Sequence, residues 1–489
     1  MLPGRLALVA QSGAVCTAML DFALPLGIGF STVISLGGVL DVDVGELLDA
    51  LIDDADTDGI LLYLEQVHEA RRFLSALRSA ARAKPVVLLK AGRAMEPDEL
   101  RPSPDAVFDA AMRRCGTVRV RTYTQLFAAA RMLSSGRIPA GDRIAVVANG
   151  RGPAMLAADS ARDAGIELAR LARATIDALD AILPEESART NPVDVRGDAP
   201  PERLASAVRV VLADASVDAV VALHVPRPVD PPVDAARAVA EVARASPKPV
   251  LGAWLGAIER PEARAALDAG GIANFYTPEN AVEAFAFLAS YRRHQELLLE
   301  VPPSQPEPEP PDDAEVMRIH AAIGKRDTLD ADELAALLRA FRLPVPSLER
   351  VHTLDEAKAA ARRLGYPVAL VVDAPPPLAP VHGPIADGRA LGRAWNAVAL
   401  EAGASGAPPR LFVRPALRVD RARALCVSIA ADDTFGPVIS LGASARPPLA
   451  PPTPALALPQ LNRRLALDLI AGERRGAGAL GAAEDVEPL

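Results

Sequence analysis

The sequence predicts an α/β protein with two doubly wound parallel sheets in tandem, followed by a smaller α+β part. Short apolar runs alternate with helical patterns from Arg5 to about Glu300. Such runs between helices are typical of parallel strands that are buried on both faces. One strand–loop–helix pattern also occurs twice, as RLALVAQSGAVCTAML at 5–20 and as RIAVVANGRGPAMLAAD at 143–159. This repeat predicts two units of one design.

The first predicted unit spans residues 1–137. Its expected strands are Leu6–Ala10, Phe30–Leu36, Gly59–Glu65, Pro85–Lys90 and Val118–Val120. Its expected helices are Val15–Leu24, Val44–Asp53, Glu69–Ala83, Pro104–Arg114 and Tyr123–Leu133. The strict alternation of strand and helix favours a parallel sheet with helices on both faces.

The second predicted unit spans residues 138–300 and repeats this alternation. Its expected strands are Ile144–Ala148, Ile166–Leu168, Ala219–His224 and Pro249–Ala253, and its last expected helix is Pro278–Leu299. The stretch VPPSQPEPEPPDD at 301–313 then alternates proline with acidic residues. This composition favours an extended linker over helix or sheet.

The last predicted unit spans residues 314–489, and its elements do not alternate strictly. Helices are expected near Asp313–Ile323, Asp330–Phe341 and Thr353–Leu364, the last of which opens with a capping sequence. Strands are expected at Pro346–Val351, Pro367–Asp373, Arg410–Arg414, Ala424–Ala430 and Pro437–Leu441. The mixture is typical of an α+β domain.

Composition excludes several classes of function. The net charge is −9, and no basic run is interleaved with aromatic residues, so a nucleic-acid partner is not indicated. No apolar run approaches the roughly 18 residues that span a bilayer, so no membrane partner is expected and the cytoplasm is the default compartment. Cys16, Cys115 and Cys426 lack metal-ligand spacing, and we interpret them as small buried hydrophobic residues. We expect no metal site.

The two glycine-bearing loops are the candidate phosphate-binding sites. Glycine lets the backbone turn sharply and approach a ligand, and the following helix presents unpaired N–H groups and the positive end of its dipole. We therefore expect the two helix starts to converge on one phosphate. The candidate residues are Gln11, Ser12, Gly13, Asn149, Gly150 and Gly152.

Stretches spread over nearly the whole chain resemble the NDP-forming acyl-CoA synthetases, the ADP-forming acetate–CoA ligase group related to succinyl-CoA synthetase. The matching stretches include VAQSGA (9–14), ISLGGVLDVDVGELLDAL (34–51), LLYLEQVHEARRF (61–73), KPVVLLKAGRA (84–94), NPVD (191–194) and DDTFGPVISLG (432–442). The resemblance implies two tandem flavodoxin-like, succinyl-CoA synthetase-like domains and a partial ATP-grasp domain. It also implies acyl-CoA or CoA and phosphate as ligands.

A narrower resemblance concerns the synthetase-like region of bifunctional protein lysine acetyltransferases of the Pat type. It rests on AVFDAAMRRCGTVRV (106–120), YRRHQELL (291–298) and ALPQLNRRLALDLI (457–470). Those proteins carry a GNAT acetyltransferase domain and an N-terminal CoA-binding domain, and neither is visible here. We expect either a fragment or a relative truncated at both ends, with an acetyltransferase domain or a CoA-binding subunit as a partner. An oligomer is compatible with this reading.

The phosphoryl relay that the resemblance implies is incomplete in this sequence. Glu65 matches the glutamate that would orient a phosphorylated histidine by holding the distal ring nitrogen. The loop in which that histidine would fall, 94–111, contains no histidine and has three acidic residues before Asp105. Two like charges at close range repel by about 4 kcal/mol at intermediate dielectric before screening, so these acids oppose phosphate binding. His68 is the only nearby substitute, and we expect it on the surface.

The ATP-grasp motifs are eroded as well. Val371 stands where the resemblance implies a lysine that contacts nucleotide phosphates. The stretch APPPLAPVHGPIADG (374–388) contains His382 but no lysine, and ASARPPLAPP (443–452) replaces a glycine-rich loop with a glutamate. We therefore expect binding of ATP or ADP with Mg²⁺ to be poor.

Three further positions leave alternatives open. Asp41 and Asp43 could form a metal pair or cap a helix, and the pattern favours the cap. Arg151 could bind phosphate or be exposed to solvent. His224 ends an apolar strand, where parallel sheets often bind ligands, or it is a structural residue.

Two functions remain open at this stage. The first is a catalytically silent acyl-CoA synthetase-like module that senses or binds acetyl-CoA, CoA or a related metabolite and regulates an acetyltransferase. The second is an active ADP-forming acetate–CoA ligase that a partner chain completes. A fragment of a lysine acetyltransferase is a further alternative.

Overall fold

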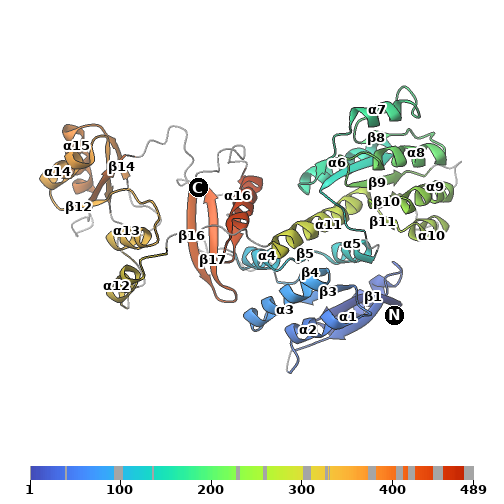
Figure 1. Cartoon of the computed structure of the whole chain (residues 1–489), viewed down its shortest axis with the longest axis horizontal. Coiled ribbons are helices and arrows are strands. Elements are labelled where there is room, and N and C mark those ends of the chain that lie inside the picture. The colour runs from blue at the N-terminus through green and yellow to red at the C-terminus, as the bar shows by residue number, and fades with distance from the viewer. Residues whose placement is uncertain are drawn as a thin grey trace. The chain divides into compact units, whose positions relative to one another are not determined.

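The computed structural model describes residues 2–38, 41–92, 103–134, 137–226, 232–256, 261–300, 310–324, 326, 329, 331–372, 381–403, 411–416, 425–443 and 455–477. The chain divides into two compact units, of which the first joins Met1–Val301 to Leu425–Leu489 and the second is Pro302–Ala424. Figure 1 shows the elements of both. Most of the predicted linker, residues 301–309, lies outside the described residues.

The first sheet has five parallel strands in the order β2-β1-β3-β4-β5. Its strands are β1 (Pro3–Ala10), β2 (Phe30–Ser35), β3 (Gly59–Leu64), β4 (Val86–Lys90) and β5 (Val118–Val120). Its helices are α1 (Gly13–Ala23), α2 (Val44–Asp53), α3 (Ala70–Ala83), α4 (Pro104–Arg114) and α5 (Tyr123–Ser134). Alternate strand residues pack against α2, α3 and α4 on one face and against α1 and α5 on the other. The predicted doubly wound sheet is confirmed.

The second sheet is also parallel, in the order β11-β10-β9-β6-β7, with β8 pairing with β6 as well. Its strands are β6 (Arg143–Ala148), β7 (Glu167–Leu168), β8 (Val193–Asp194), β9 (Ala219–His224), β10 (Val250–Trp254) and β11 (Ala273–Asn274). Because β7 and β8 share the same edge of β6, the order matches that of the first sheet. Asn191 lies between β7 and β8, and its carboxamide accepts from Val146 N (3.0 Å) and donates to Ile144 O (2.9 Å).

The helices of the second sheet again lie on both of its faces. They are α6 (Arg151–Asp163), α7 (Arg173–Asp180), α8 (Pro201–Leu212), α9 (Pro232–Arg244), α10 (Pro261–Ala269) and α11 (Pro278–Leu299). Helices α7 to α10 pack on one face, and α6 and α11 pack on the other together with part of α5. Doubly wound packing is therefore confirmed for this unit too.

Two helices are shared between the sheets. On α5, Phe127 lies in the core of the first sheet, whereas Met132 lies in that of the second. The long helix α11 begins on the second sheet and reaches the first at its end, where Leu298 joins the core that contains α3 and α4 (Figure 1). There Gln295 donates to Gly116 O (3.0 Å), and His294 Nδ1 lies 2.7 Å from Thr117 O.

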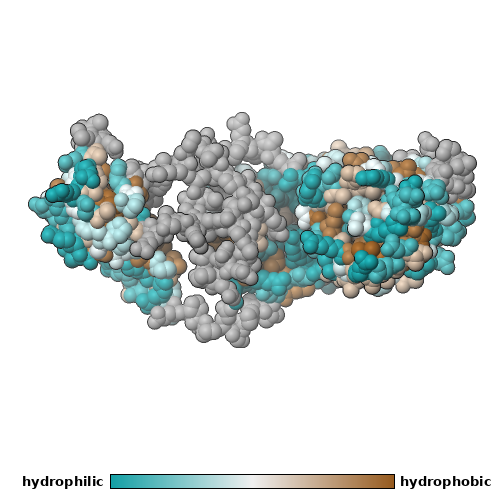
Figure 2. Space-filling view, turned by 90° about the horizontal axis from the view of Figure 1, so that it is seen from above, coloured by the Kyte–Doolittle hydropathy of each residue, from teal (hydrophilic) through white to brown (hydrophobic). Residues whose placement is uncertain are grey.

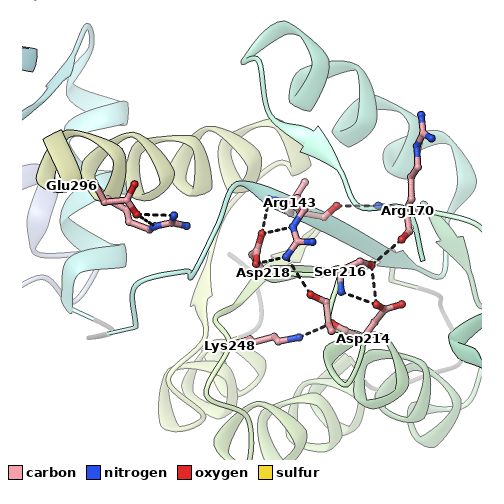
Figure 3. A network of polar contacts seen from close by, with 11 residues as sticks. Arg143, Arg170, Asp214, Ser216, Asp218, Lys248 and Glu296 are labelled. Carbon is pink, nitrogen blue, oxygen red and sulfur yellow. Dashed lines mark hydrogen bonds and ion pairs between the residues drawn. The ribbon is translucent and has the colours of Figure 1, made fainter. Parts of the chain in front are cut away.

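A polar network, here called the amino-edge latch, joins the strand starts of the second sheet (Figure 3). Arg143, at the start of β6, donates from Nε to Asp218 Oδ2 (2.9 Å) and from Nη2 to Asp218 Oδ1 (3.0 Å). Its Nη2 also donates to Ala215 O (3.1 Å). Lys248, which precedes β10, donates from Nζ to Asp214 O (2.6 Å). The network fixes the loop before β9 between two strands.

The first sheet carries the same amino-edge latch at matching positions. Arg5 binds Asp58, the residue before β3, and donates from Nη2 to Ala55 O (2.9 Å). Lys84, which precedes β4, donates from Nζ to Asp54 O (2.6 Å). The loops themselves read DADTD at 54–58 and DASVD at 214–218. The repeat seen in the glycine loops thus extends to the opposite edge of each sheet.

The end of the chain also packs into the first unit. The antiparallel strands β16 (Leu425–Asp432), β17 (Gly436–Ala443) and β18 (Ala455–Ala457) precede α16 (Arg463–Ala477). Val438 and Leu456 join the core around α4, and Arg113 of α4 donates to Leu456 O (3.3 Å). This small sheet therefore packs against α4.

The second unit holds only part of the predicted α+β domain, because residues 425–489, which were predicted to belong to it, pack with the first unit instead. Its antiparallel sheet has the order β12-β15-β13-β14, and helices α14 and α15 cover it. The strands are β12 (Glu349–Val351), β13 (Val368–Val372), β14 (Val381–Ile385) and β15 (Leu411–Pro415). The helices are α12 (Asp313–Ile323), α13 (Ala331–Ala340), α14 (Leu354–Leu364) and α15 (Gly388–Gly403).

The surface seen in Figure 2 is mainly hydrophilic, with scattered apolar side chains. Among the described residues, no helix is long and apolar enough to cross a membrane. Cys16 and Cys115 are buried, as predicted. The side chain of Cys426 lies outside the described set.

Candidate functional site

The strand order of each sheet reverses beside its first strand, and open α/β sheets bind ligands outside the carboxyl ends of the strands at that point. In the first sheet the loop at Gln11 follows β1, and Glu65 follows the neighbouring strand β3. In the second, the loop at Asn149 follows β6, and His224 ends the neighbouring strand β9. The fold therefore brings each predicted loop to a crevice suited to a ligand.

Gln11 spans the first crevice with its carboxamide. Its Oε1 accepts from Glu65 N (2.6 Å) and Gln66 N (3.0 Å), and its Nε2 donates to Gln66 O (2.9 Å). The side chain is only 8% exposed. The carboxamide thus joins β1 to the loop after β3 through three hydrogen bonds.

Asn149 does the same in the second crevice. Its Oδ1 accepts from Val225 N (2.6 Å) and its Nδ2 donates to Val225 O (3.0 Å), so it joins β6 to the loop after β9. We call these two contacts the carboxamide staples. Because both ends of each amide bind backbone, the staples fix the loops that precede the helix starts, whose first N–H groups have no partner within the helix.

The helix starts differ in how their own residues are used. Ser12 is the N-cap of α1, and its Oγ accepts from Val15 N (3.4 Å). Gly150 is the N-cap of α6 and has no side chain to cap it. A Cβ at Gly150 would lie 2.5 Å from Cγ2 of Val225, whereas one at Gly152 would meet nothing within 4 Å. Gly150 is therefore required for close packing, and Gly152 leaves the start of α6 open.

Glu65 is exposed beyond the end of β3. The Tyr63 hydroxyl donates to its Oε1 (3.4 Å), and the Tyr63 ring stacks on Tyr123 with centroids 6.4 Å apart. Burial raises the pKa of Tyr63 to about 12, helped by Tyr123 and Glu65, so this hydroxyl stays protonated and keeps donating. The role of Glu65 toward an imidazole stays a prediction, because 94–102 lies outside the described residues.

Two predictions near this crevice have clear outcomes. Asp43 is the N-cap of α2, and it forms a capping box in which Glu46 N donates to Asp43 Oδ1 (2.8 Å). The capping interpretation is thus confirmed for Asp43. Asp41 is exposed, and the described residues hold no cluster of His, Cys, Asp and Glu suited to a metal. His68 is exposed just before α3, as predicted.

A cationic cluster at the carboxyl end of β4 was not predicted. The Arg119 guanidinium lies 4.9 Å from the Phe108 ring centroid, and Lys90 Nζ, at the end of β4, lies 5.4 Å from it. Arg119 binds Asp105 and Asp109 of α4, the latter at 2.6 Å. Burial, followed by the Arg119 charge, lowers the pKa of Lys90. The sequence signal that could have revealed this cluster is the pair Asp105 and Asp109, which lie four residues apart on one face of α4.

At the second crevice, His224 is 6% exposed and stacks on Trp254, with ring centroids 5.4 Å apart and planes at 16°. The Trp254 indole donates to Pro232 O (3.2 Å), which fixes the stack. Arg151 is exposed at the start of α6. Contact of His224 or Arg151 with a ligand stays a prediction, as does convergence of the two loops.

The ATP-grasp positions lie in the second unit. Val371, which stands where a lysine was implied, pairs with Val381 of β14 and Phe412 of β15 and is half-buried. His382 is half-buried on β14. Most of the two replaced loops, 374–380 and 444–452, lies outside the described residues.

Comparison with protein families divides the chain into three matched regions. Residues 3–133 match a succinyl-CoA ligase like flavodoxin domain. Residues 144–298 match a ligase-CoA domain, and residues 320–488 match an ATP-grasp domain. The two parallel sheets thus match distinct families, and the third match covers most of the second unit together with β16, β17, β18 and α16.

Several curated relatives are similar along much of the chain. Acetate–CoA ligase (ADP-forming) I of Archaeoglobus fulgidus is 31% identical over 461 residues, which cover 90% of this chain and 64% of that protein. 4-Hydroxybutyrate–CoA ligase (ADP-forming) of Nitrosopumilus maritimus is 28% identical, covering 76% and 54%. The alpha subunit of acetate–CoA ligase (ADP-forming) I of Pyrococcus furiosus is 32% identical, covering 60% and 65%. The chain spans less than two thirds of each.

Solved structures agree with these matches. The apo form of the dinucleotide forming acetyl-coenzyme A synthetase 1 of Candidatus Korarchaeum cryptofilum has a TM-score of 0.56 at 28% identity, covering 62% of this chain and 68% of that chain. A second structure of that protein contains phosphate and ADP. With its three matched regions, which include a succinyl-CoA ligase-like and an ATP-grasp domain, the chain is similar along most of its length to ADP-forming acyl-CoA ligases.

Proposed function

We propose that the chain is an acyl-CoA ligase-like module that binds acetyl-CoA, CoA or phosphate and is catalytically silent as a ligase. The observation that carries the proposal is the pair of carboxamide staples. Gln11 and Asn149 hold both crevices in one geometry beside helix starts of the kind that bind phosphate groups. The names of the relatives, acetate–CoA ligases, support the class of ligand.

The residues at the positions of the phosphoryl relay support the proposal that the chain has no ligase activity of its own. None of the six histidines falls in 94–111, where the phosphorylated histidine would lie. Val371 offers an apolar side chain inside a strand, so it cannot contact a nucleotide phosphate through a charge. Glu65 would then be an acid whose imidazole partner is missing.

The module would act by sensing the ligand and regulating another protein. An acetyltransferase domain or a CoA-binding subunit is the partner that we propose, and the cytoplasm is the proposed compartment. The Pyrococcus furiosus relatives are named as alpha subunits, which supports assembly with a further subunit.

Calorimetric titration of the full chain tests the proposal. Acetyl-CoA, CoA, inorganic phosphate and ATP with Mg²⁺ would be titrated separately. The variant Gly152→Asp places a carboxylate in open space at the start of α6 and should abolish binding of the anionic ligands. The matched control is Gly392→Asp, where a Cβ also meets nothing within 4 Å but lies in the second unit.

Binding of acetyl-CoA or phosphate that Gly152→Asp removes and Gly392→Asp keeps would support the module. No binding of any CoA species or phosphate would overturn it. Binding of ATP with Mg²⁺ would contradict silence and leave the ligase open.

The alternative function is an active ADP-forming acetate–CoA ligase that a partner chain completes, with His68 as the phosphate acceptor on this chain. This residue is exposed after β3 and borders a small cleft together with Gln11 and Asp43, which favours access to a ligand at the first crevice. ATP would transfer its γ-phosphoryl group to the His68 ring nitrogen and release ADP. Labelled phosphate retained by the chain and lost in His68→Ala would replace the silent module with the ligase.

A further inference from the structure

A cavity of about 650 Å³ lies at the amino ends of the strands of the first sheet. The start of β1, the turn before β2, the end of α5 and the start of β11 contribute to its walls. The candidate site lies at the other end of β1, roughly 20 Å away at the usual rise of a strand. The cavity is therefore separate from the crevices described above.

The walls of the cavity combine apolar side chains with charged ones and come from both halves of the first unit. Leu26 and Ile28 precede β2, Ile138 follows α5, and Ile272 precedes β11. Cavities of a few hundred cubic ångströms that combine apolar side chains with placed polar groups, where two domains meet, are typical of sites for small molecules.

More positively than negatively charged residues line the cavity. The Arg5 guanidinium is neutralised by Asp58, and Arg131 donates to Asp268 Oδ1 (2.6 Å). Arg137 instead donates to a main-chain oxygen, Ala243 O (2.8 Å). Within the described part of the chain, Arg137 has no carboxylate partner. The cavity thus presents one positive charge without a compensating acid.

We propose that this cavity binds an organic monocarboxylate with an apolar body. The Arg137 guanidinium provides donors in a planar fork, which matches a carboxylate, and the aliphatic walls cover the body of the ligand. A dianion would bring one charge more than Arg137 neutralises. A neutral apolar molecule would leave Arg137 without an anion.

Binding should also stabilise the fold. The ligand touches the strands of the first sheet and the region of β11 in the second, so it binds the folded unit and not the unfolded chain. Such a ligand raises the unfolding temperature, and the rise grows with the logarithm of its concentration above the dissociation constant. This gives a readout that is independent of any ligase activity.

The test uses the full chain with 4-phenylbutyrate as the probe and 4-phenylbutanol as its neutral counterpart. Calorimetry and thermal unfolding would be measured for the unchanged chain and for Arg137→Gln. The control is Arg71→Gln, an exposed arginine on α3 that does not line the cavity. Ile138→Asp, at a side chain that is 48% exposed, adds an opposing charge and is a second variant if Arg137→Gln is itself less stable.

We expect 4-phenylbutyrate to bind and raise the unfolding temperature, with affinity reduced about tenfold in Arg137→Gln and in Ile138→Asp, as befits a lost charge-assisted contact. Arg71→Gln should bind normally, and the alcohol should bind about tenfold more weakly than the acid. Equal affinity of acid and alcohol, unchanged binding in both cavity variants, or no binding to the unchanged chain would each overturn the proposal.

Discussion

The two sheets resemble each other at their amino edges and differ at their carboxyl edges. At the amino edges the sheets are alike, since Arg5, Asp58 and Lys84 make the contacts that Arg143, Asp218 and Lys248 make. At the carboxyl edges only the carboxamide staples match. The side chains around them differ. In the first sheet the exposed Glu65 accepts from Tyr63, whereas in the second sheet His224 and Trp254 form a buried stack. The repeated design keeps the contacts that fold each sheet, and the contacts available to a ligand have diverged.

The two amino-edge latches differ in how deeply their aspartates are buried, so we expect them to contribute differently to stability. The Asp218 side chain is 7% exposed, whereas that of Asp58 is 60% exposed. We expect Asp218→Ala to lower the free energy of unfolding by about 1–2 kcal/mol, because it removes a buried carboxylate that accepts three hydrogen bonds from Arg143, whose own side chain stays partly solvated. Asp58→Ala should have a much smaller effect, since exposed pairs contribute little. Urea unfolding of both variants checks this, and equal losses would contradict it.

Acid should weaken the contact between the sheets at α11. Burial lowers the pKa of His294 to about 4, so the folded chain holds this imidazole neutral. The unfolded chain binds the proton near pH 6.5, so stability is complete above that pH and is lost as pH falls toward 4. The full loss, reached below pH 4, should be about 3–4 kcal/mol, because the two pKa values differ by about 2.5 and each unit corresponds to about 1.36 kcal/mol. Unfolding curves at several pH values check this, and His294→Gln should flatten the dependence.

The glycines after β6 should respond differently to the same change. A methyl group at Gly150 would overlap Val225, so Gly150→Ala should lower the free energy of unfolding by about 1–2 kcal/mol. Gly152→Ala adds a methyl group in open space within α6 and should leave stability unchanged or raise it by up to about 1 kcal/mol. Thermal unfolding of the two variants is the measurement. A loss in Gly152→Ala as large as that in Gly150→Ala would show that packing against Val225 is not the cause.

Loss of either carboxamide staple should change stability by nearly the same amount, because the two staples make equivalent contacts. Replacement of Gln11 or Asn149 by leucine removes hydrogen bonds to backbone groups beside solvent, and each should cost about 1 kcal/mol. Amide exchange should report it, with faster exchange at Glu65 and Gln66 in Gln11→Leu and at Val225 in Asn149→Leu. A change confined to one of the two variants would show that the crevices are not built alike.

Local patterns predicted the fold well, and long-range contacts were out of reach. The helices Val44–Asp53 and Pro104–Arg114 were predicted with the bounds that they have, because caps and apolar spacing are local signals. Strands β8 and β11, with two residues each, have no pattern of their own and are fixed by pairing with β6 and β10.

The candidate site was predicted in part for the same reason. The glycine loops and Glu65 follow from strand ends, and the fold places them at the crevices. The staple role of Gln11 was not predicted, because its partners lie 54 and 55 residues away along the chain. Likewise, packing of β17 and β18 on α4 joins segments more than three hundred residues apart, as Arg113 and Leu456 show.

The sharing of α5 and α11 has a consequence for how the halves could ever be separated. If the chain were cut between Arg137 and Ile138, the first fragment would carry Met132 away from the second sheet, and the second would carry Leu298 away from the first. Each fragment would expose part of an apolar core, and neither should be a stable monomer. Produced together, they should reassemble by exchanging these helices, as two pieces of an interlocked protein.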